Sequence, residues 1–209
     1  LFCFLGLESQ MLVIERIKTR QQGFSMAELL IVILIIAIIA VIALPQIMSS
    51  RRLMRYAGTQ RQVVSVLREA RQEAVSQRTA ITMRYNDLDK TMSLSGGVFG
   101  APGTANNRVF QLAGEGLSAD DLTYGRPTGV STAALGDATN LTALTSNSLE
   151  VTFRTDGSVV DGSNNPLNHA LFFYDAQNPG QSAFAVSVLG AGGRAKIWKY
   201  ASSVNAYVE

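Results

Sequence analysis

Glu28 is the only charged residue between Phe24 and Leu44, a segment of twenty-one residues that is otherwise mostly apolar. About twenty apolar helical residues span the roughly 30 Å hydrocarbon layer of a membrane, so this segment is a candidate transmembrane helix. A carboxylate in that layer costs about 2.5–3.5 kcal/mol on insertion scales and is usually retained for a partner. One interpretation is therefore that Glu28 is retained for a partner. The alternative is an interfacial carboxylate that reaches headgroup water, since Glu28 lies close to one end of the apolar run.

Arg194, Lys196 and Trp198 form a second group, in the stretch "RAKIWKY". If this stretch is a strand, alternation places the three side chains on one face and the residues between them on the other. Two cations beside an indole could hold the phosphates of DNA while the ring stacks on a base. The alternative is a solubilised edge hairpin, whose cations deter pairing with other sheets.

Residues that could support catalysis or bind a metal are sparse. His169 is the only histidine, and an ordinary loop histidine is a simpler interpretation than a catalytic base. The glycines of "GAGGRAK" fit neither the dinucleotide-binding pattern nor a phosphate loop. Residues 156–165 offer oxygen ligands for calcium but lack the twelve-residue spacing with its closing Glu. We expect no catalytic residue, no metal site, no cofactor and no enzymatic activity.

The charge is unevenly distributed along the chain, although the formal net charge is only +2. Residues 50–78 hold seven Arg against two Glu, whereas residues 79–209 hold eight Lys or Arg against eleven Asp or Glu. The only cysteine, Cys3, precedes the apolar run, so the rest of the chain can form no internal disulfide.

A secretory signal peptide is the alternative interpretation of the apolar run. Such signals usually have an apolar region of about 7–15 residues and a small-residue cleavage site, whereas this apolar run is longer.

The segment 45–78 is predicted to be an amphipathic helix. Pro45 removes one helical hydrogen bond and is expected to kink the chain, the alternative being that it ends the membrane helix. Apolar residues then recur at spacings of three and four, as one face of a helix requires. These residues are Leu53, Tyr56, Ala57, Val63, Val64, Leu67, Ala70 and Ala74. We expect this face to pack against a sheet.

Residues 79–209 are predicted to form a small antiparallel β-sheet head. Short stretches rich in Val, Phe, Tyr and Thr are bounded by Gly, Asn and Asp. They are "AITMRYN", "KTMSLSGG", "RVFQLA", "SLEVTFRTDGSVVD", "ALFFYD" and "SAFAVSVLGAGGRAKIWKY". Asp156-Gly157 predicts a hairpin turn, because Gly adopts positive φ at little cost, and Gly190–Gly193 should turn the last hairpin. Residues 96–145 read as long loops with one or two short strands.

At the N-terminal end, Gly23-Phe24-Ser25-Met26-Ala27-Glu28, between basic residues and an apolar helix, resembles the class III signal of type IV pilins and type II secretion pseudopilins. The resemblance implies that a prepilin peptidase cuts between Gly23 and Phe24 on the cytoplasmic face and methylates the new amino group. It implies a leader over residues 1–23, with Met11 as the true start, and a transmembrane helix over residues 24–44. Glu28 would then pair with the amino group of Phe24, on its own chain or a neighbour, during filament assembly.

The combination of "LEVTFRTDGSV" with a final "GGRAKIW" resembles the GspH/FimT family of minor pilins and pseudopilins. The implied fold is α+β and pilin-like, with a long kinked N-terminal helix packed on an antiparallel sheet. In FimT-like members a Gly-Arg-x-Arg motif binds DNA. Here the motif is Gly193-Arg194-Ala195-Lys196, and Lys lacks the planar fork of Arg.

The resemblance implies a structural subunit with a cytoplasmic N-terminus and a periplasmic head, held first in the bacterial inner membrane and then in a filament. Expected partners are the prepilin peptidase, major and other minor pilins or pseudopilins, the inner-membrane assembly platform and, through the last hairpin, DNA. A FimT-like minor pilin of a type IV pilus is favoured. A GspH-like pseudopilin for protein export is the first alternative, and an uncut, singly anchored binding domain is the second.

Overall fold

The computed structural model describes residues 24–113, 119–161 and 163–209. The chain divides into two compact units, one that ends at Pro45 and one that covers Gln46–Glu209. A single helix, α1 (Met26–Gln77), contributes to both units. The helix continues through Pro45, so the alternative in which this proline ends the membrane helix is wrong. A kink at Pro45 stays a prediction.

The second part of α1 is amphipathic, as its apolar spacing predicts. Most of the residues expected on the apolar face are buried in the core of the head, together with one that the pattern missed, Val66. The buried apolar side chains are Tyr56, Val63, Val64, Val66, Leu67, Ala70 and Ala74. Leu53 was expected among them but is 38% exposed, so the buried stripe begins one turn later than predicted.

The head contains two antiparallel sheets, where a single sheet was expected. The first sheet has the order β3-β2-β1-β5, with strands β1 (Ile81–Asn86), β2 (Thr91–Ser95), β3 (Arg108–Gln111) and β5 (Ser148–Phe153). Its register pairs Met83 with Leu94 on one side and with Val151 on the other. The short helices η1 (Gly97–Phe99) and η2 (Ala119–Asp121) lie in the connections on either side of β3.

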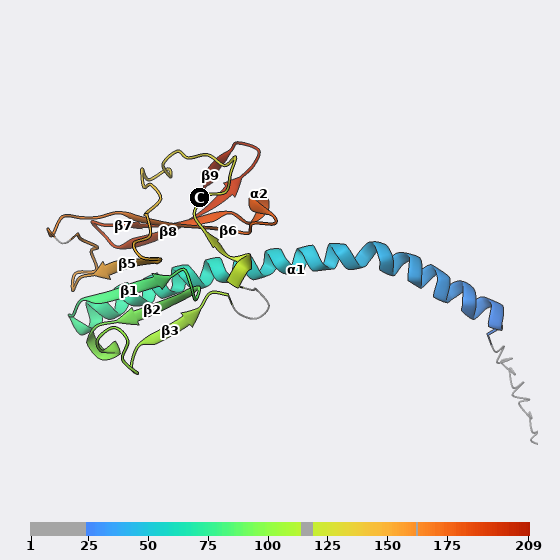
Figure 1. The fold of residues 1–209 in the computed structure, drawn as a ribbon, viewed down its shortest axis with the longest axis horizontal. Coiled ribbons are helices and arrows are strands. Elements are labelled where there is room, and N and C mark those ends of the chain that lie inside the picture. The colour runs from blue at the N-terminus through green and yellow to red at the C-terminus, as the bar shows by residue number, and fades with distance from the viewer. Residues whose placement is uncertain (1–23, 114–118, 162) are drawn as a thin grey trace, which may run out of the picture. The chain divides into compact units, whose positions relative to one another are not determined.

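The second sheet has the order β4-β6-β7-β8-β9. Its strands are β4 (Thr123–Tyr124), β6 (His169–Tyr174), β7 (Phe184–Leu189), β8 (Arg194–Ala201) and β9 (Ala206–Val208). A four-residue helix, α2 (Pro179–Ser182), connects β6 to β7. Neither α2 nor β9 is predicted by the sequence pattern. Both sheets lie alongside the second part of α1 (Figure 1).

Two hydrophobic clusters cover the two faces of the second sheet. The larger cluster joins α1 to the inner faces of both sheets, with Phe173 at its centre in edge contact with Tyr85 and Tyr124. The smaller cluster lies on the opposite face, where Phe172 and Trp198 pack against Leu135 from the irregular segment after β4. Because both faces are covered, β6 and β7 are buried along almost their whole length instead of at alternate positions.

Two glycine turns form as predicted. The amide of Gly157 donates to the carbonyl of Arg154 (2.8 Å) with φ +79°, and the amide of Gly193 donates to the carbonyl of Leu189 (2.7 Å) with φ +57°. The hairpin expected after Gly157 is incomplete, because the isolated bridge Phe153–Val159 joins its two arms and Val160 pairs instead with Pro166. The described parts of the loop-rich segment, residues 96–113 and 119–145, contain two short strands, β3 and β4, as expected.

Ion pairs and hydrogen bonds connect the second part of α1 to the surrounding loops. Arg52 forms ion pairs with Asp121 and with Asp175, the latter at 3.2 Å between Nε and Oδ2, and also donates to Gln177. Asp175 is 1% exposed. The hydroxyl of Tyr56 donates to the carbonyl of Asp121. These contacts connect residues more than sixty positions apart in the chain.

Candidate functional site

The first residues that the structure describes form the start of α1. Phe24 is 78% exposed and lies just before the helix. Ser25 supports the first turn, because its hydroxyl accepts a hydrogen bond from the amide of Ala27 (3.3 Å) and its carbonyl accepts one from Leu29 (3.1 Å). Gly23, the residue before the expected cut, lies outside the described residues.

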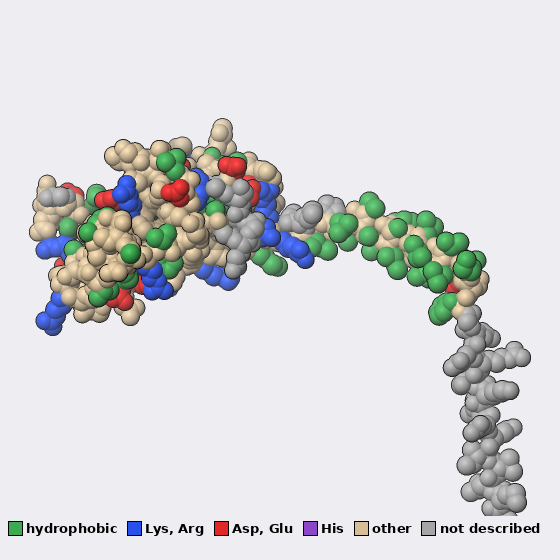
Figure 2. Space-filling view, turned by 60° about the horizontal axis from the view of Figure 1, so that its bottom comes forward, with side chains coloured by type: hydrophobic (Ala, Val, Ile, Leu, Met, Phe, Trp, Pro, Cys, Tyr) green, Lys and Arg blue, Asp and Glu red, His purple; other side chains and the backbone are tan. Residues whose placement is uncertain are grey.

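Met26–Leu44 is long and apolar enough to cross a membrane, and none of it is buried within the structure. Figure 2 shows hydrophobic side chains along the visible face of this segment. Fourteen large hydrophobic side chains between Met26 and Leu44 are exposed. Their exposure to water would be costly at roughly 25 cal/mol per Å² of apolar surface, which is consistent with an environment of lipid or of other apolar helices. Large exposed side chains include Leu29, Ile33, Ile36, Ile39 and Ile42.

Glu28 lies in the first turn of α1. A negative charge is favourable there, because the unpaired amides of a helix N-terminus carry partial positive charge worth about 0.3–1 kcal/mol. That contribution is smaller than the cost of placing a carboxylate in the hydrocarbon layer. Helix geometry alone therefore does not account for Glu28, and within the described part of the chain no ion pair involves it.

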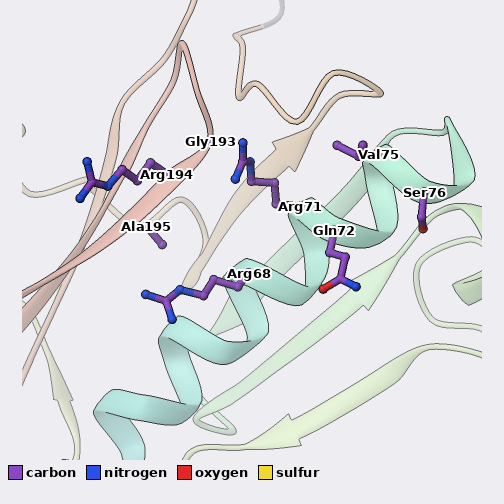
Figure 3. A pocket seen from close by; sticks show the side chains of 8 residues that line it. All are labelled: Arg68, Arg71, Gln72, Val75, Ser76, Gly193, Arg194 and Ala195. Atoms are coloured by element: carbon purple, nitrogen blue, oxygen red, sulfur yellow. The ribbon is translucent and has the colours of Figure 1, made fainter.

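A basic groove of about 590 Å³ lies in the head, between α1 and the start of β8 (Figure 3). Arg68, Arg71 and Val75 come from α1, while Arg194 and Ala195 come from β8. An adjoining hollow of about 420 Å³ shares Arg68 and adds the side chains of Arg61 and Ile197. We call the two together the basic groove. No ion pair of its four arginines is found among residues 24–113, 119–161 and 163–209.

Two glycine turns position Arg71 in this groove. A β-carbon on Gly157 would lie 3.1 Å from Arg71 Nε, and one on Gly193 would lie 3.2 Å from Arg71 Cδ and 1.9 Å from the carbonyl oxygen of Gly157. The two turns therefore contact each other and leave room for the Arg71 side chain only because both positions are glycine. The sequence predicts both turns but not the contact between them.

The three residues expected to bind DNA lie on β8 and differ in their surroundings. Arg194 is exposed and lines the basic groove. Lys196 forms an ion pair with Glu209 (3.0 Å) and lies 5.3 Å from the centre of the Trp198 ring. Lys196 and Trp198 share a face, as the alternation predicted, and Arg194 at the start of the same strand lies beside the basic groove.

Trp198 is only 6% exposed, so in this structure its ring offers no open face on which a base could stack. Its indole N–H donates to the hydroxyl of Ser187 (2.9 Å), which in turn donates to Asp137. A β-carbon on Gly136 would lie 3.0 Å from the indole ring. The irregular segment that contains Gly136 packs over the indole ring. Because this segment has no regular structure, no periodic sequence pattern predicts that it buries Trp198.

The N-terminal segment gives the clearest link to known proteins. Residues 18–44 match the family described as the prokaryotic N-terminal methylation motif. The methylation motif contains Gly23, Phe24 and Glu28, and the match confirms the resemblance to pilins and pseudopilins at this end of the chain. The α+β class, with a long N-terminal helix followed by antiparallel sheets, is also confirmed.

Two solved structures are similar to this chain, both of the type IV minor pilin FimU from Pseudomonas aeruginosa (strain PAO1), in space groups P21 and P65. Sequence identity is 19% for the first and 18% for the second, and each match covers 68% of this chain. The matches cover 86% and 90% of the two FimU chains, with a TM-score of 0.41 in both cases. No curated protein matches the sequence.

Outside the methylation motif, the other candidates for chemistry have ordinary structural positions. His169 begins β6, is 7% exposed, and burial lowers its pKa. Its Nδ1 has no partner among the described residues. The carboxylates of Asp156 and Asp161 accept hydrogen bonds from Ser158 and Asn165 within their own turns, which lowers the pKa of each carboxyl group. In the described part of the chain no group of three acidic, His or Cys residues is arranged to hold a metal.

Proposed function

We propose that this chain is a minor pilin or pseudopilin, a structural subunit that assembles through its N-terminal helix after cleavage between Gly23 and Phe24. The methylation motif at residues 18–44 carries the proposal. It is supported by an apolar helical segment with no partner in the described structure and by a carboxylate in the first turn of that helix.

The proposed mechanism is assembly without turnover. Cleavage after Gly23 creates a cationic amino group on Phe24, four residues before Glu28. One helical turn covers about 5.4 Å, and helical side chains tilt toward the N-terminus, so the Glu28 carboxylate points back toward this amino group. Pairing the two charges, within one chain or between neighbours, offsets part of the penalty of placing Glu28 among apolar helices.

The proposal places the chain first in the bacterial inner membrane, with its N-terminus in the cytoplasm and its head in the periplasm. Its partners are the prepilin peptidase, the other pilins of the filament and the inner-membrane assembly platform. We favour a type IV pilus, because of the resemblance of the Gly193-Arg194 turn to FimT-like minor pilins. A type II secretion pseudopilus is the alternative.

DNA capture by Arg194 and Lys196 with Trp198 does not form part of the proposal. Trp198 is buried, and Lys196 already contacts Glu209 and the indole ring. The function of Arg194 is considered with the basic groove below.

The test is the N-terminal mass of the chain recovered from membranes of cells with and without a prepilin peptidase. A chain that starts at Phe24 and carries one added methyl group, and does so only when the peptidase is present, is the expected result. An intact chain that still contains Gly23 in both strains would refute the proposal and leave a singly anchored β-rich domain.

A further inference from the structure

The basic groove follows the solvent-facing side of α1 over a length that suits a short peptide. Arg61, Arg68 and Arg71 are separated by seven and three residues, which places them on one face of the helix. Ten residues of helix correspond to about 15 Å. An extended chain of about five residues has the same length, at roughly 3.3 Å per residue.

The charge of the groove requires an acidic partner. Four arginines line it, and the acidic residue in its lining, Glu69, is already paired with Arg108. Arg71 is positioned by the turns at Gly157 and Gly193, so part of the entropy cost of ordering its side chain on binding is already met. Guanidinium groups bind carboxylates through two parallel hydrogen bonds.

The floor of the groove favours a polypeptide over a nucleic acid. Val75 is 47% exposed, and Ala195 and Ile197 lie beside it or in the adjoining hollow. Apolar surface edged by arginine is typical of protein interfaces, whereas a phosphate backbone brings no apolar group to cover such a floor. The occupant should therefore alternate carboxylates with small apolar side chains.

We propose that the basic groove binds an acidic, partly apolar segment from the head of a neighbouring subunit. This inference rests on the proposed assembly into a filament, since only a filament supplies such a neighbour. Arg68 and Arg71 project from α1, and Arg194 lies across from them on β8 (Figure 3).

The first test measures fluorescence anisotropy of a short labelled peptide of alternating Glu and Val, titrated with the full chain in nonionic detergent. We expect binding that weakens as salt increases and that is lost when Gln replaces Glu in the peptide. Arg71→Gln should weaken binding about two- to fivefold, the range for one solvent-exposed charge pair, and Arg71→Lys should retain most of it. The matched control is Arg84→Gln, which removes an exposed arginine on β1 that does not line the groove.

Three results would overturn the inference. The two peptides could bind equally, Arg84→Gln could weaken binding as much as Arg71→Gln, or a short oligothymidine could bind more tightly than the peptide and depend on Arg71. The last result would identify a nucleic-acid site instead. Thermal unfolding of each variant shows whether a loss of binding reflects a loss of fold.

The second test measures how variants of the basic groove assemble into filaments in cells. Arg71→Glu should lower the amount of the chain in isolated filaments, while Arg84→Glu should not, and the N-terminal mass of both variants should show cleavage before Phe24. Cleaved chains that assemble equally well would overturn the inference and leave the proposed function standing. Uncut chains would instead refute the proposed function, and with it the filament neighbour as occupant.

Discussion

At the scale of single residues, the turn glycines do more than reverse the chain. Gly157 and Gly193 both have positive φ, and each leaves space that Arg71 occupies. The sequence predicts the turns, because Asp-Gly and a glycine cluster are strong local signals. It does not predict their contact, which joins residues more than thirty positions apart and depends on how β7 and β8 pack against α1.

Gly193→Ala should destabilise the head substantially. The new β-carbon would lie 1.9 Å from the carbonyl oxygen of Gly157, and the left-handed conformation costs an alanine roughly 1 kcal/mol by itself. We expect the free energy of unfolding to fall by about 2–4 kcal/mol, measured by chemical denaturation. Gly192→Ala is the matched control, because no atom lies within 4 Å of its added carbon, and it should change stability by less than about 0.5 kcal/mol. Equal effects of the two substitutions would contradict the contact.

His169 should make the head less stable in mild acid. Burial lowers its pKa, so the folded chain holds the proton less tightly than the unfolded chain, in which a histidine has a pKa of about 6.5. Its contribution to stability is therefore complete above that value and is lost as the pH falls through the lower, folded pKa. We expect the unfolding free energy of the natural chain to drop between about pH 7 and pH 5 more steeply than that of His169→Val.

The slope attributable to His169 cannot exceed about 1.4 kcal/mol per pH unit, the limit for a single proton. Glu150 lines the same hollow as His169 and is exposed, so Glu150→Gln serves as the control. Parallel pH profiles for the natural chain and His169→Val would show that the histidine does not titrate in this window.

At the scale of elements, α1 was the most predictable part of the chain. Its length and its apolar stripe follow from residue spacing, because a helix repeats every 3.6 residues. The division of the strands into two sheets was not predictable, since strand spacing does not specify which edges pair. Trp198 shows the same limit, because the segment that buries it has no regular structure and leaves no periodic signal.

Arg52 should be the most sensitive charged residue on α1. Its replacement by Ala leaves Asp175 buried without its ion-pair partner, and removing one member of a buried pair typically costs about 3–5 kcal/mol. Thermal unfolding of Arg52→Ala should show this loss, whereas Arg51→Ala, an exposed neighbour, should be close to neutral. The double variant Arg52→Ala/Asp175→Asn should recover part of the stability, because it removes the unpaired charge. A double variant no more stable than Arg52→Ala would show that charge is not the cause.

At the scale of the whole molecule, the two compact units differ in the surface that they expose. The unit that ends at Pro45 exposes apolar side chains and contains the candidate membrane span Met26–Leu44. The unit Gln46–Glu209 has its own core and carries the basic groove. Hydropathy and charge change sharply along the sequence, and this change predicts an apolar N-terminal segment distinct from the rest of the chain. The sequence could not predict the groove, whose lining residues come together only when β8 packs on α1.

Glu28→Gln is the substitution that tests the account most directly, with the amount of chain in isolated filaments as the measurement. Glutamine keeps the size of the side chain but cannot pair with the amino group of Phe24. We expect normal cleavage before Phe24 and a roughly tenfold or greater loss from filaments, as the loss of one partly buried ion pair of about 1.4 kcal/mol or more would give. Glu150→Gln on the head should assemble normally. Full incorporation of the cleaved Glu28→Gln chain would contradict the central claim that this carboxylate directs assembly.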